Sequence, residues 1–238
     1  MRSGIAWLLI IVIITVGLTQ ILLPLALEGR VERALRQRLA AVEYLAVDIQ
    51  SRPALMSLVG RFRRIRIEAK DFVIDDLPVG AFLVQGRQVK LDPRALYRNG
   101  EVLVENAADL RVTVLLTEDG INQYLWEKVD PEKRLHISLM AEGAALVGNI
   151  NFFGHGIDIN LRGVFQVREQ TKIIFVPEAL TVEKLEVPQV ILNALVEDKA
   201  LLMDLARLPV PLIIDEMRLE QGQLYAFGHY AKLSGEGR

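Results

Sequence analysis

The chain has 238 residues, of which 51% are hydrophobic and 24% are charged, and its formal net charge is −2. This length allows one domain of ordinary to large size or two small ones, and the composition excludes both a disordered chain and a nucleic-acid binder that works by bulk positive charge. The absence of cysteine excludes disulfides, thiolate nucleophiles, cysteine-ligated metals and lipidation at cysteine.

The first element in the chain is an uncharged run from Gly4 to Leu27. As a helix it would reach roughly 36 Å, which exceeds the roughly 30 Å hydrocarbon core of a bilayer. A signal peptide has a shorter apolar core followed by small residues at a cleavage site, and residues 26–30 offer no good site of that kind. Residues 1–27 are therefore expected to form a membrane anchor or a signal segment, of which we favour the uncleaved anchor, and residues 28–238 the folded domain.

Arginines that follow the apolar run bear on its orientation. By the positive-inside rule they favour a cytoplasmic domain, whereas an N-terminal signal-anchor before a long domain is typical of export. We expect an extracytoplasmic domain on a single-pass N-terminal anchor. Because these side chains start three residues past the anchor, we also expect them to contact the membrane surface. They are Arg30, Arg33, Arg36 and Arg38.

Two helical segments follow. Residues 28–45 carry an apolar stripe at helical spacing, formed by Val31, Leu35, Leu39 and Val42. The second segment, Pro53–Val59, is short and begins with proline, which suits a first helical turn.

Most of the remaining chain alternates apolar and polar residues with a period of two, the pattern of strands with one buried and one wet face. Turn signals such as Glu142-Gly143 and Gln221-Gly222 separate these runs. The clearest alternation lies in 108–116, 135–141, 157–168 and 213–219, with Ile213, Met217 and Leu219 on the apolar side of the last run.

Several of these strands are expected to be longer than the usual length of about five or six residues. Helices are expected between some of them. A short helix begins at Asp92-Pro93, Thr117 caps a helix over Glu118–Lys128, and Pro188 opens a helical stretch to about Arg207. The pattern predicts an α+β fold. In it, one domain with a long, curved, mainly antiparallel sheet wraps around amphipathic helices and follows the anchor.

Residues for catalysis are few. His136, His155 and His229 are isolated from one another in the sequence, and there is no serine elbow or phosphate-binding loop. Asp75-Asp76 makes a poor acid/base pair, because neighbouring strand residues point to opposite faces, and we interpret it as a turn before Leu77-Pro78. We expect a non-catalytic protein with no metal and no cofactor.

A second basic group, Arg61, Arg63, Arg64 and Arg66, enters a strand whose apolar face holds Ile65 and Ile67. These arginines form either a solvated outer face or a contact with lipid phosphate. Single-stranded nucleic acid would need aromatic residues between them. Phe62 is the only one, so no nucleic-acid partner is expected.

The segment Ser51–Ala69 (SRPALMSLVGRFRRIRIEA) resembles the opening of the LmeA-like phospholipid-binding family of bacterial envelope proteins. The resemblance covers nearly all of residues 28–238. It implies an extracytoplasmic, membrane-associated domain that binds phospholipid and has a shape similar to tubular lipid-binding folds. Further matching pieces are Leu110–Glu118, Ile121–Leu125, Ile173–Pro177, Leu208–Leu212 and Gly222–Gly228.

Three functions therefore compete. The first is a membrane-anchored phospholipid-binding or lipid-transfer domain, with acyl chains in an apolar groove and Arg61–Arg66 near the headgroups. The second is a non-catalytic envelope scaffold that has a fully packed core and binds a protein partner. The third is an envelope hydrolase, which would need carboxylates or histidines that converge in a cleft.

Overall fold

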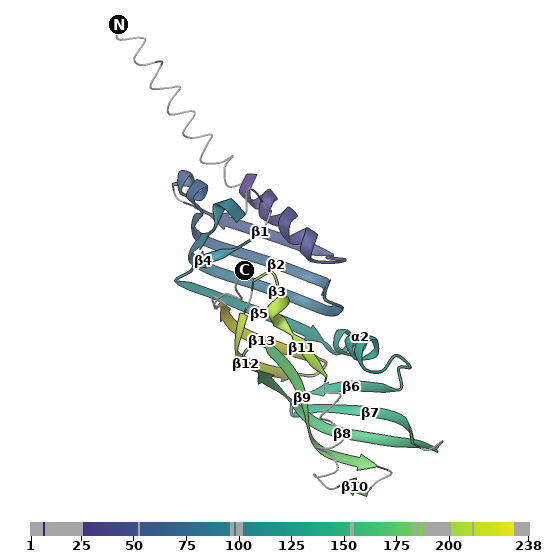
Figure 1. Cartoon of the computed structure of the whole chain (residues 1–238). Helices are drawn as coiled ribbons and strands as arrows, with labels where there is room; N and C mark the ends of the chain where they lie inside the picture. Colours follow the sequence, from purple (N-terminus) through teal and green to yellow (C-terminus); the bar gives the residue numbers. More distant parts are fainter. Residues whose placement is uncertain are drawn as a thin grey trace.

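A computed structural model describes residues 7, 26–51, 53–95, 98, 102–152, 155–182, 185–187, 201–210 and 212–230. Two antiparallel sheets follow one another along the molecule, from β1 at one end to β10 at the other (Figure 1). In chain order the elements are a helix over residues 26–38, β1 (Tyr44–Gln50), η1 (Ala54–Val59), β2 (Arg61–Ile74), β3 (Leu77–Leu91), β4 (Val104–Asn106), β5 (Asp109–Thr117), α2 (Glu118–Lys128), β6 (Leu135–Met140), β7 (Gly143–Phe152), β8 (His155–Arg168), β9 (Lys172–Val182), β10 (Leu185–Val187), β11 (Leu202–Asp204), η3 (Leu205–Arg207), β12 (Leu212–Glu220) and β13 (Gln223–Tyr230).

The larger sheet has the order β1-β2-β3-β5-β13-β12, with β4 paired to β3. One of its faces is apolar and is packed against the helix over residues 26–38. Val31 of this helix lines the same small cavity as Ile49, Ile65 and Ile67 of the sheet. The helix buries Leu27, Val31, Ala34 and Leu35, whereas its arginines face solvent. The alternation in the strands and the apolar stripe of the helix thus form one core, because each leaves its polar side outside.

The long strands β2 and β3 keep their apolar face inward although their alternation is interrupted. Between buried Phe62 and Ile65, and between buried Ala69 and Phe72, two exposed residues follow one another. Asp71 lies at the second interruption with a left-handed φ of 48°, and such irregular residues bend a strand and increase its twist. The interruptions therefore let these strands curl without turning the apolar side chains into solvent.

The smaller sheet has the order β10-β9-β8-β7-β6, with β11 paired to β9. Its edge strand β6 is closed by side chains of α2. The Asn122 amide accepts a hydrogen bond from Ile137 N at 2.6 Å and donates to Ile137 O at 2.8 Å. One turn away on each side, Trp126 Nε1 donates to Leu135 O, and Leu139 N donates to Glu118 Oε2. Because α2 pairs with the backbone of β6, no strand of the larger sheet pairs there. This explains why two sheets form where a single one is expected.

Several sequence predictions are confirmed. The long antiparallel strands are present, Asp75-Asp76 forms the turn between β2 and β3, and Thr117 Oγ1 caps α2 by accepting from Gly120 N at 3.1 Å. The Pro53–Val59 segment is helical as a 3-10 turn over Ala54–Val59.

Other predictions are wrong in part. The first helix ends at residue 38 rather than 45, and residues 44–45 already belong to β1. The helix expected to reach Arg207 does not include 201–207, where β11 and η3 lie, and residues 188–200 are outside the described ranges. In β12 a bulge at Asp215 reverses the alternation, so Leu212 and Ile214, not Ile213, share the inner face with Met217 and Leu219.

Within the described ranges, no helix combines the length and the apolar character needed to cross a bilayer. The expected anchor, Gly4–Leu27, lies outside these ranges except for Trp7, Ala26 and Leu27. Leu27 is 1% exposed and packs in the core, so the folded domain includes the last residue of the apolar run.

Candidate functional site

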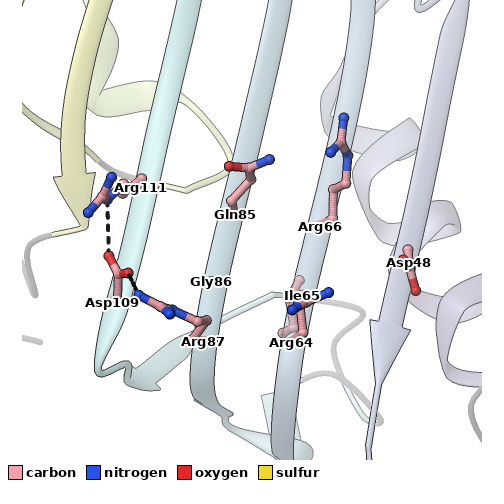
Figure 2. Close-up of a pocket in the computed structure, with 9 residues that line it drawn as sticks. All are labelled: Asp48, Arg64, Ile65, Arg66, Gln85, Gly86, Arg87, Asp109 and Arg111. Atoms are coloured by element: carbon pink, nitrogen blue, oxygen red, sulfur yellow. Dashed lines mark hydrogen bonds and ion pairs between the residues drawn. The ribbon is translucent and has the colours of Figure 1, made fainter.

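All four arginines of the second basic group are exposed on β2, and Ile65 and Ile67 beside them are buried as the alternation predicts. Arg64 and Arg66 point outward from the polar face of the larger sheet (Figure 2). Arg61 and Arg63 lie nearer the start of β2, next to η1.

Strand register adds two arginines that the sequence analysis missed. Arg64 pairs with Arg87, which pairs with Asp109 on β5. In the next row Arg66 pairs with Gln85, which pairs with Arg111. We call the four side chains Arg64, Arg66, Arg87 and Arg111 the arginine face. They surround an open depression of about 460 Å³, whose rim also includes Asp48, Gln85 and Asp109 (Figure 2).

Two carboxylates partly neutralise the arginine face. Asp109 accepts from Arg87 Nη2 at 2.7 Å and from Arg111 Nε at 3.3 Å, and the hydrogen bond from Arg87 is the main reason that the pKa of Asp109 lies below its ordinary value. Glu68 pairs with Arg66 at 3.2 Å, which similarly lowers the pKa of Glu68. Among the described residues Arg64 has no such carboxylate partner, so it carries the least compensated charge of the depression.

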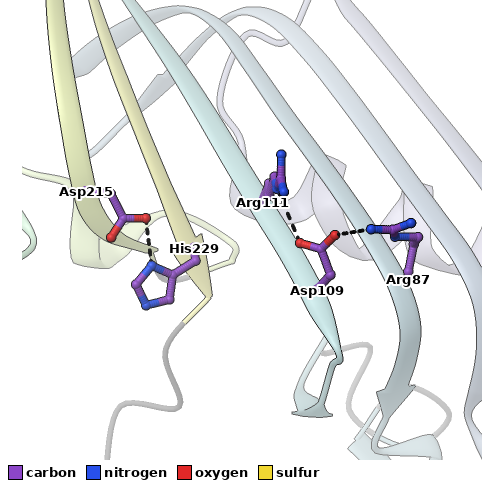
Figure 3. A network of polar contacts seen from close by, with 5 residues as sticks. All are labelled: Arg87, Asp109, Arg111, Asp215 and His229. Atoms are coloured by element: carbon purple, nitrogen blue, oxygen red, sulfur yellow. Dashed lines mark hydrogen bonds and ion pairs between the residues drawn. The ribbon is translucent and has the colours of Figure 1, made fainter.

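The histidines do not meet. His229 lies next to Arg111 across β13 and β5, and its Nδ1 is 2.7 Å from Asp215 Oδ2 (Figure 3). His136 lies on β6 of the smaller sheet, and His155 begins β8. Among the residues that the structure describes, no three His, Cys, Asp or Glu side chains are grouped as a metal site would require.

The first basic group lies on the solvent side of the helix over residues 26–38, where Arg30, Arg33, Arg36 and Arg38 are all exposed. Arg33 Nε donates to Gly29 O at 2.9 Å, and Arg36 forms an i,i+4 ion pair with Glu32 at 3.0 Å. This face of the helix is turned away from the core. It is therefore open to a charged surface beside the domain.

The apolar space between the first helix and the larger sheet is filled. A cavity lined by Val31, Ile65, Val84 and neighbouring apolar side chains holds about 10 Å³. A single water needs at least about that volume, so an acyl chain does not fit there. On the smaller sheet, by contrast, Leu146, Ile157 and Ile159 of the apolar face are only partly buried.

Guanidinium groups bind phosphate and carboxylate in a planar, two-pronged geometry, and an open basic depression on a rigid sheet holds such groups without chemistry on them. The fold and the site thus define a two-sheet β domain with an open basic depression on its larger sheet. A family model described as LmeA-like phospholipid-binding matches residues 18–226, and the chain belongs to this family, as the resemblance implies. No curated protein and no solved structure has significant similarity to the chain.

Proposed function

We propose that the protein is a membrane-anchored, non-catalytic domain of the bacterial envelope that binds or transfers phospholipid. The observation that carries the proposal is the match of a phospholipid-binding family to residues 18–226 of a chain whose sheet bears four outward arginines. In this proposal the part of the apolar run that precedes Leu27 anchors the chain, the domain is extracytoplasmic, and the arginines of the first helix face the leaflet.

The arginine face supplies the headgroup contacts in this proposal, together with Arg61 and Arg63. Within the arginine face Arg64 is the strongest candidate, because no carboxylate among the described residues neutralises it, whereas carboxylates pair with Arg66, Arg87 and Arg111. Asp109 and Glu68 pair with Arg87 and Arg66 and offset part of their charge, so a phosphate would compete with these carboxylates for the two guanidinium groups. Each basic side chain near an anionic leaflet contributes about 1 kcal/mol.

The acyl chains would lie on the smaller sheet, since the cavity under the first helix is too small for them. Leu146 and Ile159 belong to one apolar face with buried Leu161 and Phe165, and exposure rises along this face away from the larger sheet. An apolar surface of this kind gains about 25 cal/mol per Å² when an acyl chain covers it.

The test is the lipid content of the full chain purified in mild detergent, measured by mass spectrometry. Arg64→Glu should reduce the recovered anionic phospholipid on the order of tenfold, because the charge changes by two units. Arg162→Glu, at an exposed position of β8 on the smaller sheet, is the matched control and should retain the lipid. A purified chain that holds no phospholipid, while folded by circular dichroism, would overturn the proposal.

The filled interior under the first helix favours a second candidate, an envelope scaffold with a packed core that binds a protein partner. It predicts a folded chain that is free of lipid in the same measurement. Cross-linking in intact cells would then yield one defined protein partner on the outer face of the larger sheet.

A further inference from the structure

A cluster of exposed apolar side chains lies on η1, at the end of the larger sheet. Met56, Leu58 and Val59 are 42%, 47% and 53% exposed, whereas Ser57 between them is 1% exposed. These three are among only eight large hydrophobic side chains exposed in the described part of the chain. Scattered apolar side chains on a surface need no explanation, but three within four consecutive positions form a patch.

The backbone holds this patch rigidly. Gly60 ends η1 with a left-handed φ of 72°, and its N donates to Ser57 O at 3.0 Å. Leu91 N donates to Gly60 O at 2.8 Å, which fastens η1 to the end of β3. A Cβ on Gly60 would stand 2.1 Å from Leu91 O, so only glycine permits this approach. The patch is therefore a fixed part of the sheet rather than a loose loop.

The surroundings of the patch are basic and apolar. Arg61 and Arg63 follow directly and both are exposed, and within the described residues the guanidinium of neither is in an ion pair or a hydrogen bond. Leu103, 46% exposed, lies near the same end, because its carbonyl accepts from Asp92 N, next to Leu91. An apolar surface with a cationic flank has the chemistry of a segment that enters the interface of an anionic bilayer.

The chain also enters the domain at this end. Ile49 N donates to Glu28 Oε1 at 3.0 Å, which places the start of the first helix at the end of β1. Only residues 51–53 separate β1 from η1. The start of the first helix therefore lies at the same end of the domain as η1 (Figure 1). A membrane anchor formed by the apolar residues that precede this helix would place a bilayer beside the patch.

We propose that η1 is a membrane-docking tip, in which Met56, Leu58 and Val59 enter the headgroup and upper acyl region of a bilayer and Arg61 and Arg63 contact its anionic phosphates. The inference rests on the proposed function in so far as both require a membrane, and it adds the part of the domain that meets the bilayer. Arg61 and Arg63 would then serve the bilayer itself, and Arg64 the bound phospholipid.

The chain has no cysteine, so single-cysteine reporters can be placed without removing any native one. Met56→Cys and Met140→Cys form a matched pair, because the two methionines are 42% and 43% exposed and Met140 lies on β6, in the other sheet. Each full-length variant is labelled with an environment-sensitive fluorophore and reconstituted into vesicles of phosphatidylcholine and phosphatidylglycerol. These vesicles also contain lipids with a nitroxide quencher on the acyl chain.

The label at position 56 should shift to shorter wavelength and lose at least roughly twice as much fluorescence to the quencher as the label at position 140. Replacing Arg61 and Arg63 by Gln in the Met56→Cys chain should reduce this quenching in the mixed vesicles and leave it unchanged in pure phosphatidylcholine. Equal, solvent-like signals at positions 56 and 140 would overturn the docking tip.

The failure of the tip can be told from the failure of the proposed function, because lipid content is measured on the same preparations. A chain that retains phospholipid but shows no quenching at position 56 refutes only the tip. A chain that shows quenching at position 56 but carries no bound phospholipid supports the tip and refutes the lipid-binding proposal.

Discussion

Asn122→Leu should destabilise the protein severely, although the change conserves side-chain size and lies far from the arginine face. The native amide binds both backbone groups of Ile137 that point away from β7, at 2.6 and 2.8 Å, and both residues are buried. Leucine leaves Ile137 N–H and C=O without partners. Each such buried group costs about 1–3 kcal/mol, so the free energy of unfolding should fall by about 3 kcal/mol.

That loss is a large part of the roughly 5–15 kcal/mol by which domains are stable, and it corresponds to a fall of about 6–12 °C in the midpoint of thermal unfolding for a chain of this size. Circular dichroism of the full chain measures the midpoint, and hydrogen exchange measures the protection of the Ile137 amide. Gln123→Leu, at the next and exposed position of α2, should stay within about 0.5 kcal/mol of the native chain. An Asn122→Leu variant that melts with the native protein and keeps its Ile137 amide protected would refute the edge-capping argument.

The remaining predictions concern glycines and the arginine face. Gly228→Ala should unfold the chain or lower the midpoint of thermal unfolding by more than about 10 °C, because the new Cβ would stand 2.0 Å from Ile213 O. By contrast, Gly29→Ala lies in a helix with open space around it and should stabilise the chain by about 0.5–1 kcal/mol. Thermal unfolding of both variants, followed by circular dichroism, checks the two predictions. Asp109→Asn should increase the anionic phospholipid recovered with the chain about fivefold, since it frees Arg87 and adds one positive charge, and an unchanged or lower recovery would contradict the headgroup role. The pKa of Asp109 is lowered in the folded state, so the Asp109 ion pair stabilises the chain at pH values above 3.8, the ordinary pKa of an aspartate. This stabilisation is lost as the pH falls through the lower pKa of the folded state. The melting midpoints of the native chain and of Asp109→Asn should therefore differ at neutral pH and converge at a pH below that folded-state pKa.

Alternation in the sequence predicts which residues of a strand face outward, and this was sufficient for Ile65, Ile67 and the exposed arginines beside them. It does not predict which strand is the neighbour. Arg87 and Arg111 were therefore missed, although Arg111 stands in the clear alternation of Leu110 and Val112. Only the register of β2, β3 and β5 brings the four arginines together.

Two errors arise from local signals that a period alone does not resolve. The bulge at Asp215 moves Ile213 to the outer side, and one extra residue in a strand leaves no clear mark in a sequence. The segment up to Arg207 is interpreted as a helix from its sequence, but Leu201, Met203 and Leu205 are buried at a spacing of two. The apolar residues of this segment suit a helix as well as a strand, and pairing with β9 selects the strand.

The pairing of β13 with β5 has a consequence for the order in which the chain folds. Gln223 lies opposite Thr117, about a hundred residues earlier in the chain, and the whole smaller sheet is encoded between them. During synthesis the edge of β5 that does not pair with β3 therefore stays unpaired until β13 has emerged. Strand pairing that is late and distant in sequence slows folding, and until it occurs the unpaired edge of β5 can pair with strands of other chains. A chain that ends before β13 should aggregate rather than form a shorter domain.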